Sequence, residues 1–422
     1  MSRNGYLWDP NGQPPPIEAH SIAKLEVLRE YLLAYFQTLV VPQQDHLRLT
    51  LVDGFSGGGA YRHADTGVEI LGSPLIMLEA AREAEARINL GRSKRFRIDA
   101  QYYFIDEDPA ATAMLSQVLQ DRGHSGQVGN QIRVVNDSFS SSANALRNAA
   151  KENSPNSGRA IFFLDQYGYS DVPFAEIQAI FSHLPKAEVI LTFAVDALLT
   201  FVSDSPNSAR TLQTIGIPEV LRGRTIEDIK NNERDFRLYI QSQLYPALVS
   251  ACGAKFYTVF FIRTAGYGDY WLVHLSQHPR ARDVMTGVHW SKNNHFVHYG
   301  GAGIDMFSAL GYAPENDPVV TGQSELFLFD NPAAGRSVDA LAAQLPRLIR
   351  AHPEIHTFGE LYSRHCNSTP ADSRRFKEAL AKLIELGELE VAGLNGAKRR
   401  SANAIKAQDR ISLPAQGRLF LI

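Results

Sequence analysis

A chain of 422 residues can form two or three domains that each bury a core, and 44% hydrophobic with 21% charged residues is typical of a globular protein. The net charge of -3 argues against a polycation that coats nucleic acid, and the two cysteines, Cys252 and Cys366, offer neither a disulfide framework nor a zinc site. The longest apolar runs are strand-sized and no apolar signal region opens the chain, so we expect a cytoplasmic protein without membrane spans.

Hydrophobic periodicity predicts that strands and helices alternate through the first half of the chain. Ser73 is the expected cap of the second helix, with Pro74 in its first turn. Alternation at this spacing indicates a parallel sheet with right-handed crossovers. The predicted helices cover 17–40, 75–88, 110–120 and 173–181, and the predicted strands cover 49–52, 101–105, 132–135, 160–164 and 189–193.

A helical stretch and an antiparallel hairpin follow these alternating elements. Residues 205–251 are expected to be mostly helical, and 255–263 and 270–276 to form the hairpin. A parallel sheet that ends in an antiparallel hairpin is the arrangement of class I methyltransferases. We therefore expect an α/β fold with a Rossmann-like class I methyltransferase sheet over 1–300, carrying a helical insert at about 205–251.

Acidic residues stand at the ends of four predicted strands, and a glycine-rich turn follows the first. Ligands of open parallel sheets bind outside the carboxyl ends of the strands, where Asp53, Asp106, Asp137 and Asp165 would lie. The turn 53–59, Asp-Gly-Phe-Ser-Gly-Gly-Gly, lacks the G-x-G-x-x-G spacing of nicotinamide enzymes and the Lys-Ser/Thr pair of a P-loop. Any one of the acids could cap a helix instead, but four in this order favour a cofactor site.

The turn and the acids fit S-adenosylmethionine better than a cofactor bound through its pyrophosphate. Asp53 suits the cationic methionine end, Asp106 would accept hydrogen bonds from the ribose hydroxyls, and Asp137 would accept one from the adenine amino group. The predicted cofactor-binding residues are Asp53, Phe55, Gly57, Gly58, Gly59, Asp106, Glu107, Asp137 and Ser138.

Six stretches of the chain carry a family resemblance. They are V-D-G-F-S-G-G-G at 52–59, G-S-P-L at 72–75, F-I-D at 104–106, F-L-D-Q-Y-G at 163–168, W-L-V-H-L-S at 271–276 and A-R-D-V-M at 281–285. The combination resembles the three-Cys-motif partner proteins, a bacterial family, and covers most of the chain, including its C-terminal module. The resemblance implies a methyltransferase-like fold, S-adenosylmethionine as cofactor, and a partner protein with a three-cysteine motif of the radical-SAM kind. It implies no particular substrate.

The tract after the fourth predicted strand carries the candidate catalytic residues. Amino-directed nucleic-acid methyltransferases place Asp/Asn-Pro-Pro-aromatic there, so that the acid accepts from the target amine and the ring stacks on the extruded base. The tract 165–169, Asp-Gln-Tyr-Gly-Tyr, has the acid and the aromatic residues but neither proline. We expect Asp165 to be the acceptor or base and Tyr167 or Tyr169 the stacking ring. The alternative is that Asp165 binds only cofactor or solvent and the tyrosines pack in the core.

Other candidate chemistries are weaker. Carbon-5 cytosine methylation needs a cysteine nucleophile after the fourth strand, and neither cysteine lies there. His289, His295 and His298 match no familiar zinc spacing, so no metal site is expected. Lys24 on the first helix could approach the cofactor, although a solvated lysine is the ordinary expectation.

The end of the chain predicts a winged helix over 337–422, after a linker over 301–336. A short helix, a longer helix capped by Thr369, and two strands around the turn Asn395-Gly396 indicate this fold. From Leu341 onward 13 Lys and Arg face 8 Asp and Glu, a local charge of +5. The module would contact nucleic acid or, alternatively, dock a protein. The candidate phosphate contacts are Arg374, Arg375 and Lys377, facing outward on the recognition helix, and Lys398, Arg399 and Arg400 at the wing.

These observations predict an S-adenosylmethionine-dependent methyltransferase that acts on DNA or RNA, with an exocyclic amine as the preferred acceptor. A second hypothesis is a cofactor-binding subunit that docks the three-cysteine protein and catalyses nothing alone. A third keeps the methyltransferase but replaces nucleic acid with a small molecule.

Overall fold

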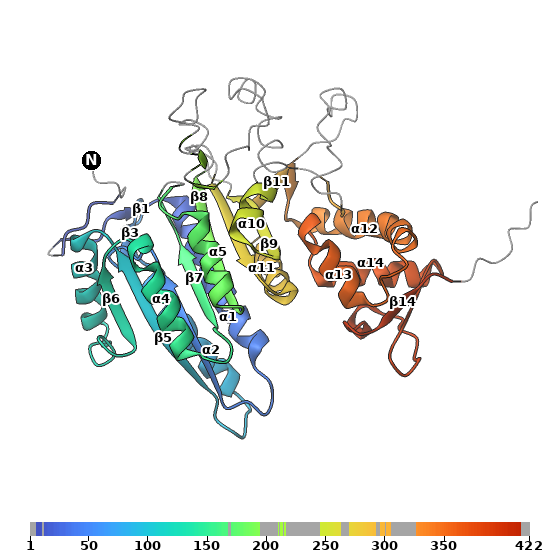
Figure 1. Ribbon diagram of the computed structural model, residues 1–422, viewed down its shortest axis with the longest axis horizontal. Coiled ribbons are helices and arrows are strands. Elements are labelled where there is room, and N and C mark those ends of the chain that lie inside the picture. The colour runs from blue at the N-terminus through green and yellow to red at the C-terminus, as the bar shows by residue number, and fades with distance from the viewer. Residues whose placement is uncertain are drawn as a thin grey trace, which may run out of the picture. The chain divides into compact units, whose positions relative to one another are not determined.

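The computed structural model describes residues 6–10, 12–167, 170–194, 245–262, 270–292, 296–299, 301–304 and 326–414, with isolated positions between 210 and 216. The chain divides into two compact units (Figure 1). The first comprises Met1–Phe236 and Gln243–Val288, and the second Arg237–Ser242 and His289–Ile422. Over the described ranges, no helix combines the length and apolar character that a membrane crossing requires.

A mostly parallel sheet forms the centre of the first unit (Figure 1). Its strands are β2 (His46–Asp53), β5 (Arg97–Asp106), β6 (Ile132–Asn136), β7 (Ala160–Leu164), β8 (Ala187–Ala194), β9 (Phe256–Ile262) and β10 (Tyr270–Ser276). They lie in the order β9–β10–β8–β7–β2–β5–β6. Neighbours from β8 to β6 pair in parallel, whereas β10 runs antiparallel to both β8 and β9. This arrangement is that of the class I methyltransferases and confirms the predicted fold class.

Helices cover both faces of this sheet. They are α1 (Ala19–Leu39), α2 (Ser73–Asn89), α3 (Pro109–Asp121), α4 (Phe139–Asn153), α5 (Phe174–His183), α10 (Tyr245–Cys252) and α11 (Pro279–Ser291). The helices α4 and α5 lie on one face, and α1 and α2 on the other (Figure 1). Pro74 stands in the first turn of α2, but the expected cap Ser73 is wrong. Gly72 occupies the N-cap position without a side-chain cap, and Ser73 is already the first residue of the helix.

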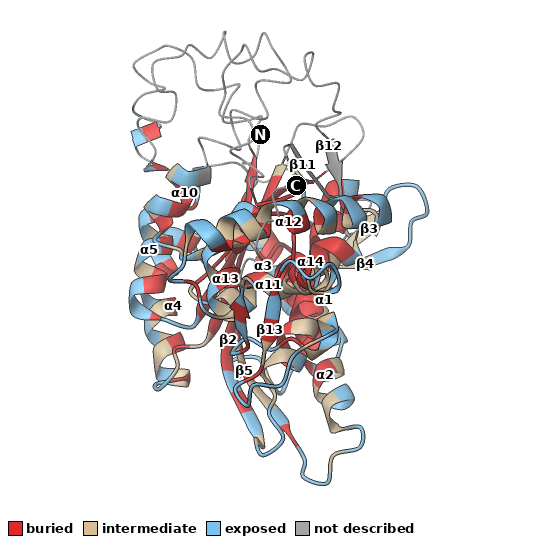
Figure 2. Ribbon diagram, turned by 90° about the vertical axis from the view of Figure 1, so that its right-hand side faces the viewer, coloured by how far each residue is buried: buried red, intermediate tan, exposed pale blue. Residues whose placement is uncertain are grey.

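Burial increases along β2 and β5 towards their carboxyl ends (Figure 2). The first residue of each strand is exposed, and the last five residues of each are buried. The strand β7 is buried at every position, as expected for a parallel strand covered on both faces. The predicted ligand residues therefore stand at the end of the sheet from which water is best excluded.

A small sheet beside the glycine turn leaves no signal in the sequence pattern. Its strands are β1 (Pro16–Ile17), β3 (Ala60–His63) and β4 (Glu69–Leu71), with β3 paired to both others. The hairpin of β3 and β4 is inserted between the turn and α2, where the Gly72 amide donates to the Gly59 carbonyl at 2.8 Å. Strands of two to four residues are too short to show a period.

Two predicted segments lie largely outside the described residues. Of the expected helical insert at 205–251, the structure describes isolated positions and α10 at its end. The expected linker at 301–336 is described only in part, and its last part is ordered. There β12 (Leu326–Leu328) pairs antiparallel with β11 (Phe296–Tyr299), and α12 (Asn331–Ala351) begins.

The second unit has the element order of a winged helix. After α12 come α13 (Phe358–His365), α14 (Ser373–Glu385), β13 (Glu390–Ala392) and β14 (Arg410–Ser412). The strands β13 and β14 pair antiparallel as the wing, and Thr357 forms a further bridge to Arg410. The expected cap Thr369 is wrong, because α14 begins at Ser373 with the Asp372 carboxylate accepting from the Arg375 amide.

Trp290 anchors the packing of this second unit. Its side chain is 7% exposed and lies edge-on to Phe329, with 4.9 Å between ring centroids. The indole N–H donates to the Pro370 carbonyl at 2.8 Å, which holds the residues just before α14. The Arg375 guanidinium lies 3.4 Å from the centre of the indole ring.

We predict that Trp290→Ala destabilises the second unit by about 3–5 kcal/mol, because it removes a large buried side chain and leaves a cavity. Urea unfolding with amide hydrogen exchange in α14 measures the loss. Leu386→Ala is the control: this side chain is 62% exposed, and its removal should cost less than about 0.5 kcal/mol. Equal protection of α14 in wild type and Trp290→Ala would contradict the anchoring role.

Candidate functional site

Asp53, at the end of β2, is a fully buried carboxyl group. Its Oδ1 accepts from the Phe55 amide at 3.2 Å, while its Oδ2 has no hydrogen-bond partner among the described residues. The pKa of Asp53 is raised to about 7, mainly by burial and to a smaller extent by the charges of Asp165 and Asp106, although hydrogen bonds from Ser73 and the Phe55 amide lower it. The site therefore holds an acid that lacks a cationic partner.

Asp106, at the end of β5, links the glycine turn to the sheet by a hydrogen bond. Its Oδ2 accepts from the Gly57 amide at 2.8 Å and its Oδ1 from the Asp108 amide at 2.9 Å. Burial raises its pKa, although these two amides lower it. Asp106 also lines the pocket described below, so it can accept hydrogen bonds from a ligand there.

The glycine turn is covered by an aromatic cluster that sequence reasoning missed. Gly57 and Gly59 have φ angles of 57° and 81°, which favour glycine. A Cβ on Gly58 would lie 2.5 Å from the Trp8 ring. The rings of Tyr6, Trp8 and Tyr61 pack together, with centroids 5.1 to 6.0 Å apart. The turn therefore needs glycine because an indole ring, as well as any ligand, approaches its backbone.

A pocket of about 100 Å³ opens at the carboxyl ends of β2, β5 and β7. It brings together five predicted site residues, Phe55, Gly57, Asp106, Asp165 and Tyr167, with unpredicted neighbours from the N-terminal segment, α1 and β10. It is smaller than the roughly 300 to 1,000 Å³ of typical small-molecule sites. Asp53 is buried and does not line the pocket. The other predicted site residues that do not line it are Gly58, Gly59, Glu107, Asp137 and Ser138. Tyr169 lies outside the described residues.

Ser138 is the N-cap of α4, and Asp137 stands just before it. Asp137 accepts from the Ser138 amide at 2.8 Å and from the Ser142 hydroxyl at 3.2 Å. The Ser138 hydroxyl accepts from the Ser141 amide at 3.2 Å. The cap at this strand end is therefore Ser138 and not the acid, and an adenine contact of Asp137 stays a prediction.

Asp165, the candidate catalytic acid, is paired with Lys24 of α1. The distance from Lys24 Nζ to Asp165 Oδ1 is 2.6 Å, and the lysine side chain is only 6% exposed. No hydrogen bond from the described residues reaches Asp165 Oδ2, which leaves this oxygen as an acceptor at the pocket. Lys24, for which the sequence left open a cofactor contact or a solvated position, is buried and contacts the catalytic candidate, 141 residues along the chain.

Aromatic rings form one side of the pocket. His20 and Tyr270 stack with ring centroids 4.5 Å apart and 10° between planes. Burial, followed by the charge of Lys24, lowers the pKa of His20 to about 4, so its imidazole is neutral at pH 7. Tyr167 is 61% exposed and lines the same pocket, which makes it a ring that an incoming flat group can reach.

Gln166 shapes the tract after β7 in place of the missing proline. Its side-chain oxygen accepts from the amides of Asp171 and Val172, both at 3.1 Å. Gln166 is among the residues that line the pocket, and its Nε2 is buried without a hydrogen-bond partner within the described ranges. The tract therefore brings an acid and an exposed ring to the pocket on either side of a buried amide.

The predicted basic residues of the winged helix divide into exposed and engaged ones. Arg374 is 81% exposed and pairs with Glu378 at 2.9 Å. The expectation that Arg375 faces outward is wrong, because it lies on Trp290 and bonds to Asp372 at 2.9 Å. Arg399 makes two bonds to Asp409, at 2.7 and 3.1 Å. The remaining three are Lys377, 5.4 Å from the centre of the Phe358 ring, Lys398, bonded to Glu390 at 2.6 Å, and the exposed Arg400.

The structure describes only part of the histidine cluster. His289 is buried, whereas His295 lies outside the described residues. In the described part of the chain, no group of three or more His, Cys, Asp or Glu side chains is placed to hold a metal ion.

One family model matches the chain. Residues 311–396 match the family described as the GMT-like wHTH domain, which confirms that the C-terminal part of the chain contains a winged helix. The match begins within the expected linker at 301–336, so the bounds of 337–422 stay a prediction. No curated protein matches the chain.

Similar solved structures share little sequence with the chain. A Legionella pneumophila protein of the family DUF519 is 11% identical, with a TM-score of 0.36 over 63% of this chain and 91% of its own. The bifunctional kinase-methyltransferase WbdD is 11% identical, with a TM-score of 0.33 over 61% of this chain but only 39% of its own. TYW2 of M. jannaschii, in complex with AdoMet, is 10% identical, with a TM-score of 0.27 over 61% and 75%. The fold assignment rests on the strand order.

We predict that Asp53→Asn raises the free energy of unfolding at about pH 8 by roughly 2–4 kcal/mol. The folded protein holds a proton on Asp53 up to about pH 7, whereas the unfolded chain releases it near pH 4. Stability is therefore highest at low pH and is lost as pH rises through about 7.

The gain should vanish below about pH 4, where both states are protonated. Urea unfolding across this pH range measures it, with Asp99→Asn, on the exposed part of β5, as the control. A difference between wild type and Asp53→Asn that does not change with pH would contradict a buried, titrating carboxyl group.

Proposed function

We propose that this protein is an S-adenosylmethionine-dependent methyltransferase that modifies an exocyclic amine of DNA or RNA. The observation that carries the proposal is the buried Asp53 carboxyl group with an unpartnered oxygen, next to Asp106 and Asp165 at the carboxyl ends of a class I methyltransferase sheet. Open parallel sheets bind ligands at this edge.

The acids fit the charge of this cofactor. A cationic amino group near Asp53 would keep its carboxylate ionised despite burial, and Asp106 would accept from the ribose hydroxyls. The third acid, Asp165, is already paired with a cation, the ammonium group of Lys24. When bound, the cofactor supplies an electrophilic methyl group carried on a sulfonium.

The tract after β7 fits a flat amine as acceptor. Asp165 Oδ2 would accept a hydrogen bond from the amine and turn its lone pair towards the methyl group, while Lys24 fixes the carboxylate. The exposed ring of Tyr167 would stack on the base. The neutral, stacked His20 and Tyr270 rings would exclude water from the other side.

The winged helix supports nucleic acid as the substrate. Winged helices place a helix and a wing tip against DNA or RNA, and this end of the chain carries an excess of basic residues. Arg374, Lys398 and Arg400 are the exposed candidates for phosphate contacts. Arg375 and Arg399 would instead hold the helix and wing in shape.

A second candidate function is a cofactor-binding subunit that docks a three-Cys-motif protein. The ion pair between Lys24 and Asp165 favours it, because a carboxylate bound at 2.6 Å by a buried ammonium is less available to an incoming amine. The departure from Asp-Pro-Pro-aromatic favours it as well. In this case cofactor binding would be retained, and methyl transfer would need the partner. A cytoplasmic location stays a prediction in both cases.

Calorimetry tests the cofactor. We predict that Asp53→Asn and Asp106→Asn each weaken binding of S-adenosylmethionine by about 10- to 100-fold, since each removes a charge-assisted contact. Binding to the wild type should weaken about tenfold per pH unit below about pH 7, where Asp53 is protonated in the free protein. Asp99→Asn is the matched control. Undiminished binding by the Asp53→Asn, Asp106→Asn double variant would reject the cofactor site.

Transfer of a labelled methyl group to total nucleic acid tests the reaction. We predict that Asp165→Asn lowers the rate by about 100-fold or more while cofactor binding stays within about twofold, because in the proposed arrangement the free oxygen of Asp165 serves the acceptor and Asp53 and Asp106 serve the cofactor. Lys24→Met should also lower the rate by freeing Asp165 from its fixed position. An unchanged rate in Asp165→Asn would remove the catalytic assignment. Transfer that appears only after addition of a three-Cys-motif protein would support the second candidate function.

A further inference from the structure

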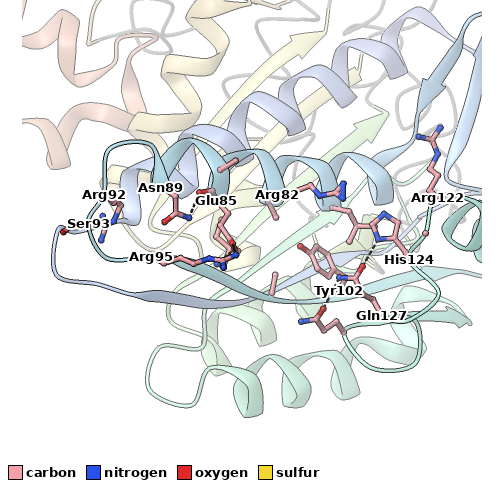
Figure 3. Close-up of a pocket in the computed structure, with 17 residues that line it drawn as sticks. Arg82, Glu85, Asn89, Arg92, Ser93, Arg95, Tyr102, Arg122, His124 and Gln127 are labelled. Atoms are coloured by element: carbon pink, nitrogen blue, oxygen red, sulfur yellow. Dashed lines mark hydrogen bonds and ion pairs between the residues drawn. The ribbon is translucent and has the colours of Figure 1, made fainter.

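A second hollow, of about 720 Å³, lies on the face of the sheet that carries α2 and α3 (Figure 3). Its floor is formed by alternate residues of β5, namely Ile98, Ala100 and Tyr102, which point to the same face because side chains alternate along a strand. Helix α2 supplies one wall, and the turn between α3 and β6 supplies the other. This groove starts near the amino end of β5, whereas the proposed cofactor site lies at its carboxyl end.

The groove is strongly basic. Arg82, Arg95, Arg122 and His124 line it together with a fourth arginine, Arg92 (Figure 3). Glu85 is the only acidic residue among those that line it. One oxygen of Glu85 is already used, because it accepts from the Ile98 amide at 2.8 Å.

The arginines differ in how firmly they are held. Arg92 is structural, since it donates to the Pro42 and Gln44 carbonyls at 2.9 and 2.7 Å. Arg95 is 80% exposed and lies 3.9 Å from Glu85. Arg122 is paired with Glu69 on the surface, an interaction of little strength that an anion can replace.

Arg82 and His124 are the remaining basic residues that line the groove. No ion pair or hydrogen bond in the described part of the chain engages the exposed Arg82 guanidinium. His124 Nδ1 and the Gln127 side-chain oxygen are 2.7 Å apart, which orients the ring (Figure 3). The groove thus presents Arg82 and Arg95 as guanidinium groups that no strong local partner satisfies.

The charges are spread along the groove. From Ile98 to Tyr102 the floor runs four residues, about 13 Å of extended strand. Arg95 stands beyond the first of these residues, while Arg82 and Arg122 lie towards Tyr102 (Figure 3). A single phosphate group could contact the arginines at only one end of such a groove. A chain of regularly spaced phosphates could contact the arginines at both ends.

We propose that this groove binds the phosphodiester backbone of a nucleic acid strand through Arg82, Arg95, Arg122 and His124. Guanidinium groups bind phosphate oxygens in a bidentate manner, which suits the planar ends of Arg82 and Arg95. The floor ends four residues before Asp106, again about 13 Å along β5. A nucleic acid strand that continues beyond this end of the groove would have to cross this distance to reach the carboxyl edge of the sheet. The inference rests on the proposed function only in taking nucleic acid as the substrate.

Fluorescence anisotropy of the full chain with a labelled single-stranded oligonucleotide tests the groove, without S-adenosylmethionine. The double variant Arg82→Glu, Arg95→Glu should weaken binding by about tenfold or more at about 100 mM salt, and the dependence of log K on log salt should become shallower by about 1 to 2 units. Arg87→Glu is the matched control, since it lies on α2 with a half-exposed side chain outside the groove and should change binding by less than about twofold.

The other results each overturn the proposal. No binding by the wild type, unchanged binding by the double variant, or an equal loss in Arg87→Glu would show that the groove does not hold nucleic acid. Competition by a mononucleotide or by polyglutamate as effective as that by the unlabelled oligonucleotide would show that a free nucleotide or an acidic peptide is the ligand. Calorimetry of the double variant with S-adenosylmethionine separates this test from that of the cofactor, because the groove residues do not line that pocket.

Discussion

The hydrogen bond from the Gly57 amide to Asp106 Oδ2 is the interaction on which the site depends. It joins the turn after β2 to the end of β5, and so fixes where the backbone of the turn lies relative to the acids. The same turn covers Asp53, whose carboxyl group is completely buried. A buried carboxylate is costly to ionise without a cation. The same geometry that holds the turn in place therefore buries Asp53 where a nearby positive charge would stabilise its ionised form.

Lys24 supplies a positive charge to the site, but not to Asp53. Helix α1 places its ammonium against Asp165, at the end of β7, and not against Asp53. The charges of Asp165 and Asp106 still raise the pKa of Asp53. A protein would gain stability by replacing Asp53 with a neutral residue, so its presence is a cost to the folded state. Such a cost is expected where a residue serves a ligand, since functional sites are commonly the places where stability is given up.

The sequence predicted the sheet but not the contacts that complete the site. Periodicity is a local signal, and it located β2, β5 and β7 because each has a clear apolar run ending in an acid. It could not reveal that Lys24 meets Asp165, because the two are 141 residues apart and only the crossing of α1 over the sheet brings them together. It also could not predict that Trp8 packs on the glycine turn, because a single indole ring against glycine leaves no periodic pattern in the sequence. Asp137 shows another limit: a strand-end acid is the same residue type whether it accepts from residues of a nearby helix, such as the Ser142 hydroxyl of α4, or binds a ligand.

The two ends of β5 also differ in charge, and this difference bears on how a substrate would be held. Asp106 stands at one end in an acidic, buried setting, and the basic groove begins at the other. An acidic edge repels phosphate and attracts a cationic cofactor, so it cannot supply the affinity for nucleic acid by itself. In the proposed function, that affinity would come from basic surfaces away from the reacting atoms, as phosphate contacts position a nucleic acid without selecting its sequence. The tract Asp165 to Tyr167 would then be free to select a base, because it would not also have to bind the backbone.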